Sequence, residues 1–161
     1  MTMQNEQGRT MLEMLGVIAI IGIITYGAIA GINYGMTSYK INQTYNDVQD
    51  IISGVSDLYS WSKEYPNRSE MMEAIAANDI VSGEIHECTS GGSGNKCIMG
   101  QFGNITVEPT DSGASFQVNV SLSDGDICTR LASLDWKAAN IHIENSQCEK
   151  TSAYILKFSP D

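Results

Sequence analysis

The hydrophobic pattern opens on a long apolar run near the N-terminus of the chain. No residue between Met14 and Tyr39 is charged, and the run from Met11 to Ile32 is almost wholly apolar. A membrane-spanning helix needs about 20 apolar residues at a rise of about 1.5 Å each, and this run supplies them. It contains one carboxylate, Glu13, near its start. A carboxylate in the headgroup zone costs little, but one deeper in lipid costs about 2.5–3.5 kcal/mol and marks a candidate functional residue.

The helical period continues beyond the apolar run. Apolar side chains spaced four and three residues apart form a stripe, made of Ile41, Tyr45, Val48, Ile52, Val55 and Tyr59. A period of about 3.5–3.6 residues predicts a helix face that packs on a core. The sequence therefore predicts one helix from about Thr10 to Ser62. Tyr65-Pro66 ends it, because the residue before a proline is pushed out of the α region.

The remainder of the chain mixes helix and strand signals. Asn67 and Glu70 form a capping-box pattern ahead of a short helix that stops near Asn78. A loop or short extended piece follows over 80–85, and a Gly/Ser loop lies between Cys88 and Cys97. Alternation predicts a hairpin of strands 103–108 and 115–120 with a turn at 111–113, then a helix over 124–134 and strands over 141–143 and 153–158. This order predicts an α+β fold, in which a long N-terminal helix packs on a small antiparallel-sheet head domain.

Three glycines repeat at every fourth position of the apolar run. Gly27, Gly31 and Gly35 fall near one face of a helix and would let another backbone approach closely. Glycine is also simply common in membrane helices, so both interpretations stay open. The run is too long for the apolar region of a cleaved secretory signal, and it lacks a basic start. The nearest small-residue cleavage pattern, Ala28-Ile29-Ala30, lies inside the apolar stretch.

Composition and charge limit what the head domain can do. The chain has 161 residues and a formal net charge of −10, which argues against a nucleic-acid-binding surface. All four cysteines follow the apolar run, and an even number there fits disulfides in an oxidising compartment. Arg9 is the only cationic side chain before the run, whereas Lys40, Asp47 and Asp50 follow it. This charge distribution predicts that the N-terminus lies on the inner side of the membrane and the head on the outer side.

The N-terminal segment resembles the prepilin signature of type IV pilins and type II secretion pseudopilins. The resemblance rests on Gly8 through Ile23, GRTMLEMLGVIAIIGI, in which a short polar leader ends in Gly8 and Glu13 follows at the fifth position counted from Arg9. In that family a peptidase cuts after the Gly, the new amino group is methylated, and the apolar helix polymerises. The sequence departs from the pattern in two ways. Arg9 stands where the family usually has Phe or Met, and the leader MTMQNEQG contains no Lys or Arg.

A second segment, from Gly100 to Trp136, looks like the head domains of type IVb pilins. Here a Gly-containing turn leads into a strand, a strand with a Phe follows, and a helix with a Cys precedes the C-terminal loop. Together the resemblances imply a leader of residues 1–8 and a transmembrane and assembly helix over 9–39. The pilin head would span 40–161, including the helix end at 40–62 and a disulfide-bounded region at 128–148.

The four cysteines allow three pairings. The two local closures, Cys88–Cys97 and Cys128–Cys148, are favoured, and the second matches the disulfide-bounded C-terminal region of the pilin family. A metal site at His86, Cys88 and Cys97 is the rival interpretation, although the spacing of the cysteines is not a zinc spacing. Some pseudopilins bind calcium in a C-terminal loop, and Asp124, Asp126 and Glu144 offer oxygens. Acids at a helix start are more often caps, so no cofactor is expected and calcium stays open.

Catalytic motifs are absent from the sequence, and no enzyme activity is expected. The resemblance implies a structural subunit of a type IV pilus-like filament, serving adhesion, motility, aggregation or DNA transfer. Its partners would be identical or related subunits, a prepilin peptidase, and the bacterial inner membrane before assembly into an extracellular pilus. Glu13 would pair with the α-amino group of a neighbouring subunit's Arg9. The alternatives are a type II secretion pseudopilin and a single-pass anchored periplasmic binding or enzymatic domain.

Overall fold

A helix of 53 residues and a six-stranded sheet dominate the structure, a computed structural model that describes residues 6–62, 64–81, 83–88, 96–110, 113–148 and 154–160. The chain divides into two compact units, Met1–Tyr39 and Lys40–Asp161. Helix α1 begins in the first unit and ends in the second. The elements are α1 (Glu6–Leu58), α2 (Arg68–Ala77), β1 (Ile85–Glu87), β2 (Lys96–Met99), β3 (Asn104–Pro109), β4 (Phe116–Leu122), α3 (Gly125–Ala132), the 3₁₀ helix η1 (Trp136–Ala139), β5 (Ile141–Gln147) and β6 (Tyr154–Pro160).

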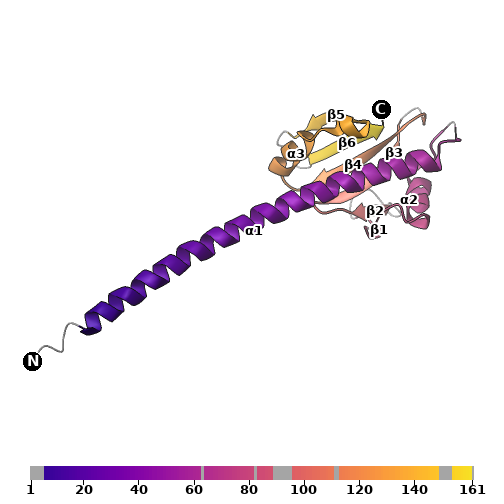
Figure 1. Cartoon of the computed structure of the whole chain (residues 1–161). Coiled ribbons are helices and arrows are strands. Elements are labelled where there is room, and N and C mark those ends of the chain that lie inside the picture. Colours follow the sequence, from indigo (N-terminus) through magenta and orange to yellow (C-terminus); the bar gives the residue numbers. More distant parts are fainter. Residues whose placement is uncertain are drawn as a thin grey trace, which may run out of the picture. The chain divides into compact units, whose positions relative to one another are not determined.

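The sheet of the second unit is antiparallel throughout, in the order β1-β2-β3-β4-β6-β5. The predicted hairpin of β3 and β4 is present (Figure 1). In its register Val107 lies opposite Val118. The last strand, β6, inserts between β4 and β5, so that Leu156 lies opposite Val120. The C-terminal part of α1 packs on this sheet. The predicted α+β architecture, a long N-terminal helix with a small antiparallel sheet, is therefore confirmed.

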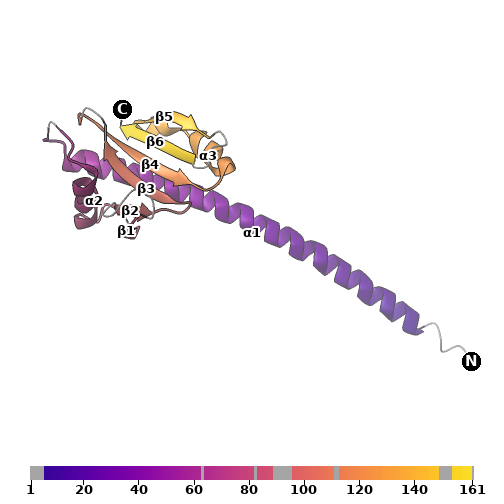
Figure 2. The same cartoon turned by 180° about the vertical axis from the view of Figure 1, so that it is seen from behind.

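Both views show the C-terminal part of α1 lying along one face of the sheet (Figures 1 and 2), and the core side chains lie between them. The predicted stripe faces this core: Ile41, Val48, Ile52 and Val55 are buried, and Tyr45 and Tyr59 are half-buried. Ile51 and Thr44 are buried beside the stripe. The Thr44 hydroxyl donates to the Lys40 carbonyl at 3.0 Å, so this polar side chain enters the core without an unpaired donor.

Helix α2 begins and ends where the sequence predicts. Asn67 is its N-cap and accepts a hydrogen bond from the Glu70 N–H at 3.1 Å. At the other end the Asn78 N–H donates to the Ala74 carbonyl. Three apolar side chains between these caps, Met71, Met72 and Ile75, are buried. The capped ends and the buried face together fix α2 beside β2 and β3 (Figure 2).

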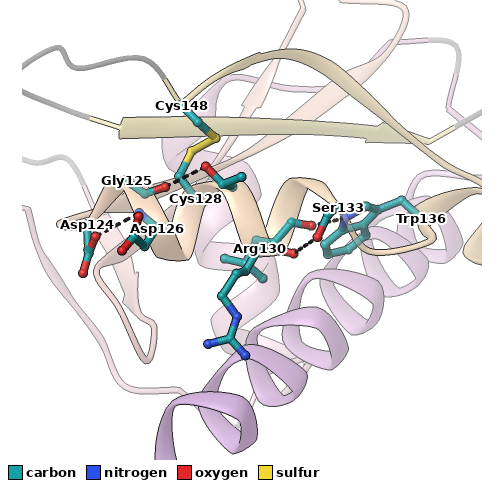
Figure 3. The surroundings of a disulfide bond; sticks show 10 residues. Asp124, Gly125, Asp126, Cys128, Arg130, Ser133, Trp136 and Cys148 are labelled. Carbon is teal, nitrogen blue, oxygen red and sulfur yellow. Dashed lines mark hydrogen bonds between the residues drawn. A yellow bond between two sulfur atoms is a disulfide. The ribbon is translucent and has the colours of Figure 1, made fainter. Parts of the chain in front are cut away.

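Helix α3 follows β4, and a disulfide joins it to Cys148, the residue directly after β5. Asp124 caps it by accepting from the Asp126 N–H at 2.9 Å (Figure 3). Cys128 and Leu131 face the core, and Cys128 is bonded to Cys148. After α3 the chain turns through η1, which ends at Asn140 with a positive φ of 55°. This 3₁₀ helix was not predicted, because one turn around Trp136 leaves no periodic pattern.

The ends of α1 differ from the prediction. The helix begins at Glu6 rather than Thr10 and ends at Leu58 rather than Ser62. It ends early because the Ser60 N–H and hydroxyl both donate to the Asp57 carbonyl and tighten the last turn. Strand β1 begins at Ile85, the last residue of the piece predicted as loop or short extended, and β2 begins at Lys96, inside the predicted Gly/Ser loop. Neither strand was predicted, since strands of three and four residues are too short to show alternation. Of the predicted turn at 111–113, only Gly113 is described, with a φ of 65° that suits glycine.

Candidate functional site

The candidate site is the apolar surface of α1 in the first unit. Its large apolar side chains expose 54–79% of their surface: Met11, Leu12, Met14, Leu15, Val17, Ile18, Ile20, Ile21, Ile23, Ile24, Tyr26, Ile29, Ile32, Tyr34, Met36 and Tyr39. A helix that is apolar on every side belongs in a membrane or inside a larger assembly. Water is a poor solvent for so large an apolar patch. The segment therefore requires lipid or other protein chains to cover it.

Two polar side chains of this segment can lie in contact with lipid or with other protein chains. The Thr25 hydroxyl donates to the Ile21 carbonyl at 2.8 Å, and the Thr37 hydroxyl donates to the Asn33 carbonyl at 3.0 Å. Both threonines thus satisfy their donors within the helix, as an apolar environment requires. By length and composition α1 is the one described helix that could cross a membrane. This criterion is weak by itself, because other kinds of apolar helix also meet it.

Glu13 is the ionisable residue of the apolar run and lies on its surface. Its neighbours along the exposed helix face are Met14, Val17 and Ile18. Among the described side chains none pairs with its carboxylate. An unpaired carboxylate that enters an apolar environment is costly, so any covered state of this segment must supply Glu13 with a partner or leave it near water.

The residues of the predicted processing site lie close to Glu13 along the helix. Gly8 and Arg9 are part of α1, which begins at Glu6. The position of the Arg9 side chain lies outside the described part of the structure. Arg9 precedes Glu13 by one helical turn, or about 6 Å along the axis at a rise of about 1.5 Å per residue. Cleavage after Gly8 stays a prediction from the sequence.

The three glycines spaced by four lie on α1 with open space around them. Apart from the neighbouring backbone of α1 itself, a Cβ atom built at Gly27, Gly31 or Gly35 would meet no atom of the described residues within 4 Å. The fold of the single chain therefore places no packing demand on these positions. Gly103 is different, because a Cβ there would overlap the carbonyl oxygen of Ser121 on β4. Close helix packing at Gly27, Gly31 and Gly35 stays a prediction about contacts with other chains.

The cysteines form two disulfides, Cys88–Cys97 and Cys128–Cys148, each with a Cα–Cα distance of 5.5 Å. These are the two pairings that the sequence favoured. Because Cys88 and Cys97 are bonded to each other, they offer no thiolates for the rival metal site with His86. In the described residues no three His, Cys, Asp or Glu side chains gather as metal ligands.

The three acidic residues considered as calcium ligands have other roles or positions in the structure. Asp124 caps α3 through the Asp126 N–H, and Asp126 stands in the first turn of that helix (Figure 3). Glu144 lies on β5, opposite Lys157 of β6, and its side chain lies outside the described part. The capping role that acids at a helix start commonly have is thus the one that Asp124 plays.

A polar cavity on the outer face of the sheet was not predicted from the sequence. Its lining includes Arg68, Asn119 and Lys157. The alternation of apolar and polar residues in β3 and β4 indicates that their polar side chains share one face of the sheet. The approach of Arg68 from α2 and of Lys157 from β6 depends on tertiary contacts, which no local pattern reveals.

Comparisons of the chain with protein-family models, with curated proteins and with solved structures found no match.

Proposed function

We propose that this chain is a structural subunit of a type IV pilus-like filament, processed after Gly8 and polymerised through its apolar N-terminal helix. The observation that carries the proposal is the exposed apolar surface of residues 11–36 with the carboxylate of Glu13 near its start. None of the described residues outside α1 covers that surface, which therefore needs cover from other molecules. Lipid supplies the cover before assembly, and the helices of neighbouring subunits supply it afterwards.

Glu13 supports a polymer over a simple anchor. In a filament core its carboxylate pairs with the α-amino group of a neighbouring subunit's Arg9, created by cleavage after Gly8. Each charge alone would be costly in an apolar core, and pairing offsets that cost. A subunit added at the wrong position along the filament axis leaves both the carboxylate and the amino group unpaired. The pair therefore selects the register of assembly, whereas an anchor needs no charge at this position.

The second unit suits a head exposed outside the cell membrane. It carries two disulfides, which persist in oxidising compartments. In this proposal the head lies in the periplasm of a bacterium while the helix is in the inner membrane, and it reaches the extracellular space in the assembled pilus. Adhesion, motility, aggregation and DNA transfer are the roles that such a filament serves.

Two other functions use the same helix. A type II secretion pseudopilin would be processed identically but would form a short piston within the cell envelope, and shearing would release no fibres from cells. A single-pass anchored domain would keep its N-terminus uncut and would tolerate replacement of Glu13. The length and apolar composition of α1 support such an anchor equally well, so the carboxylate and the processing site are the features to test.

The decisive experiment combines the mass of the mature chain with one substitution. We expect the mature mass to begin at Arg9. Glu13→Val should leave the chain in the membrane fraction and remove it from sheared filaments. Glu64→Val is the matched control, because it removes an exposed carboxylate from the turn after α1 and should leave filaments unchanged. Abundant filaments from Glu13→Val would contradict the polymer mechanism, and an uncut N-terminus would favour the anchored domain.

A further inference from the structure

We propose that the outer face of the sheet holds a binding site for a small acidic sugar, a ring with several hydroxyls and one carboxylate. The site is a cavity of about 290 Å³ on the sheet face opposite to the core. The side chains that matter for its chemistry are Arg68, Thr106, Glu108, Asn119, Ser121 and Lys157. All belong to the second unit, so the inference is independent of filament formation.

The strand register brings the polar residues of the cavity together. Thr106 on β3 lies opposite Asn119 on β4, and Asn119 lies opposite Lys157 on β6. Neighbouring strands are about 4.8 Å apart, so this row spans about 10 Å. The residues that alternate with the row, such as Val118 and Val120, face the core. The row therefore forms a continuous polar floor of the cavity across β3, β4 and β6.

Two buried polar atoms in the cavity lack a hydrogen-bond partner among the described residues. They are the Oδ1 of Asn119 and the Nε of Arg68. Arg68 is held in place, because its Nη1 donates to Glu108 Oε1 at 2.9 Å and its Nη2 donates to Cys88 Sγ at 3.4 Å. Buried polar groups without partners are rare in native proteins, so these two atoms call for hydrogen-bonding groups from another molecule. A ligand oxygen can accept from Arg68 Nε while a ligand hydroxyl pairs with Asn119.

The charges of the lining favour an anion. Arg68 and Lys157 contribute two cations and Glu108 contributes one carboxylate, so the described lining is net positive in a chain of net charge −10. Arg68 is already paired with Glu108. Lys157 stands at the outer end of the polar row and has no ion-pair partner among the described side chains. Glu144 of β5 is opposite it in the register, but the Glu144 side chain lies outside the described part of the structure. The ligand carboxylate is therefore expected beside the Lys157 ammonium group.

The remaining groups exclude simpler ligands. Acetate or another bare anion has no donor for Asn119 Oδ1, and an apolar molecule would satisfy no polar group of the floor. A hydroxyl can both donate and accept, so it serves either orientation of the Asn119 amide and the hydroxyls of Thr106 and Ser121. The cavity lies at the lower end of the roughly 300–1,000 Å³ of small-molecule sites. A single sugar ring with a carboxylate meets these conditions.

The test is calorimetric titration of the full chain in detergent micelles with D-glucuronate. D-glucose has a similar ring without the carboxylate, and acetate has the carboxylate without the ring. We expect saturable binding of glucuronate, with glucose and acetate weaker by about tenfold or more, since each loses part of the charge-assisted hydrogen bonding. This comparison needs no substitution. Absence of saturable glucuronate binding, or equal binding of glucose, would overturn the proposal.

Lys157→Met tests the position of the carboxylate. Lys157 is exposed on β6, and this change keeps most of its length while removing the charge. We expect it to weaken glucuronate binding about tenfold and to leave the weak affinity for glucose unchanged. Lys137→Met removes an exposed cation of η1 outside the cavity and should bind like the unmodified chain. Unchanged glucuronate affinity in Lys157→Met would overturn the assignment.

Discussion

The ring of Tyr45 on α1 packs against the ring of Trp136 on η1, with the ring centroids 4.6 Å apart. The other side of the indole reaches the sheet, where Trp136 and Phe158 of β6 have centroids 4.4 Å apart. The indole Nε1–H donates to the Leu131 carbonyl at the end of α3, at 2.8 Å. One buried side chain thus connects the long helix, the helix with Cys128 and the last strand.

Replacing Trp136 should destabilise the second unit strongly. Trp136→Ala removes a side chain that is 2% exposed, and such truncations cost about 3–5 kcal/mol of unfolding free energy. Trp61→Ala is the matched control, since Trp61 is 98% exposed and should change stability by less than about 0.5 kcal/mol. Urea unfolding of the full chain in detergent, followed by circular dichroism, measures both. Equal losses in the two variants would contradict the packing described for Trp136.

The two disulfides should differ in their contribution to stability. Cys128–Cys148 closes a sequence separation of 20 residues and Cys88–Cys97 one of 9. In the chain-entropy account each is worth about 3 kcal/mol, with the longer loop ahead by about 0.7 kcal/mol. Cys97 and Cys128 are both buried, but only Cys128 belongs to the hydrophobic core cluster, so its loss removes core packing as well. Paired Cys→Ala variants, compared by urea midpoint, should rank in this order. A larger loss from the Cys88 and Cys97 pair would contradict it.

The features predicted correctly from the sequence are those encoded locally. The stripe from Ile41 to Tyr59 repeats with the helical period, the caps Asn67 and Asp124 hydrogen-bond within three residues, and the hairpin of β3 and β4 shows alternation. Each pattern predicts a backbone conformation or a buried face from residues that are close together in the sequence. Core packing then follows, because only one arrangement buries these faces together.

The features that were missed depend on contacts between distant segments. Strand β1 pairs with β2 across the Cys88–Cys97 disulfide, and β6 inserts between β4 and β5. Neither arrangement has a local signature. The same holds for the polar cavity, whose residues Arg68, Asn119 and Lys157 are separated by 51 and 38 positions in the sequence. Glu13 could be identified from the sequence as a candidate functional residue, because the apolar residues beside it make a carboxylate unusual at this position.

Gly31→Ala should separate folding of the single chain from packing between chains. Beyond the adjacent backbone of its own helix, a Cβ at Gly31 meets no atom of the part of the chain that the structure describes within 4 Å. Alanine favours helix over glycine by about 1 kcal/mol. The variant should therefore fold at least as well as the unmodified chain. If helices pack closely at Gly27, Gly31 and Gly35, it should yield fewer filaments in sheared preparations.

Gly22→Ala is the control for Gly31→Ala. Gly22 also has open space around it, and it lies nine residues, or about 2.5 turns, before Gly31, on the opposite side of the helix. We expect Gly22→Ala to fold and assemble like the unmodified chain. Equal filament yields from both variants would mean that the glycine face makes no close contact between subunits.

The stability of the second unit should depend on the ionisation of Asp47, which lies on α1 outside the apolar segment. Burial, and next the neighbouring carboxylate of Asp50, raise the pKa of Asp47 above its ordinary value of 3.8. The folded chain thus holds the proton to a higher pH than the unfolded chain does. The unfolding free energy therefore falls as pH rises from 3.8 through the raised pKa of Asp47, and the loss is complete at neutral pH.

Asp47→Asn should remove this penalty. At neutral pH we expect the variant to be more stable by about 0.2–0.5 kcal/mol or more, because like charges one helical turn apart repel by about this amount. Below pH 3.8 the carboxyl is protonated in both states, and the advantage should vanish. Glu84→Gln removes one negative charge from an exposed loop and controls for the net charge of the chain. Urea midpoints measured from pH 3 to pH 7 give the comparison. An advantage of Asp47→Asn that grows toward low pH would have the opposite sign and would contradict the raised pKa.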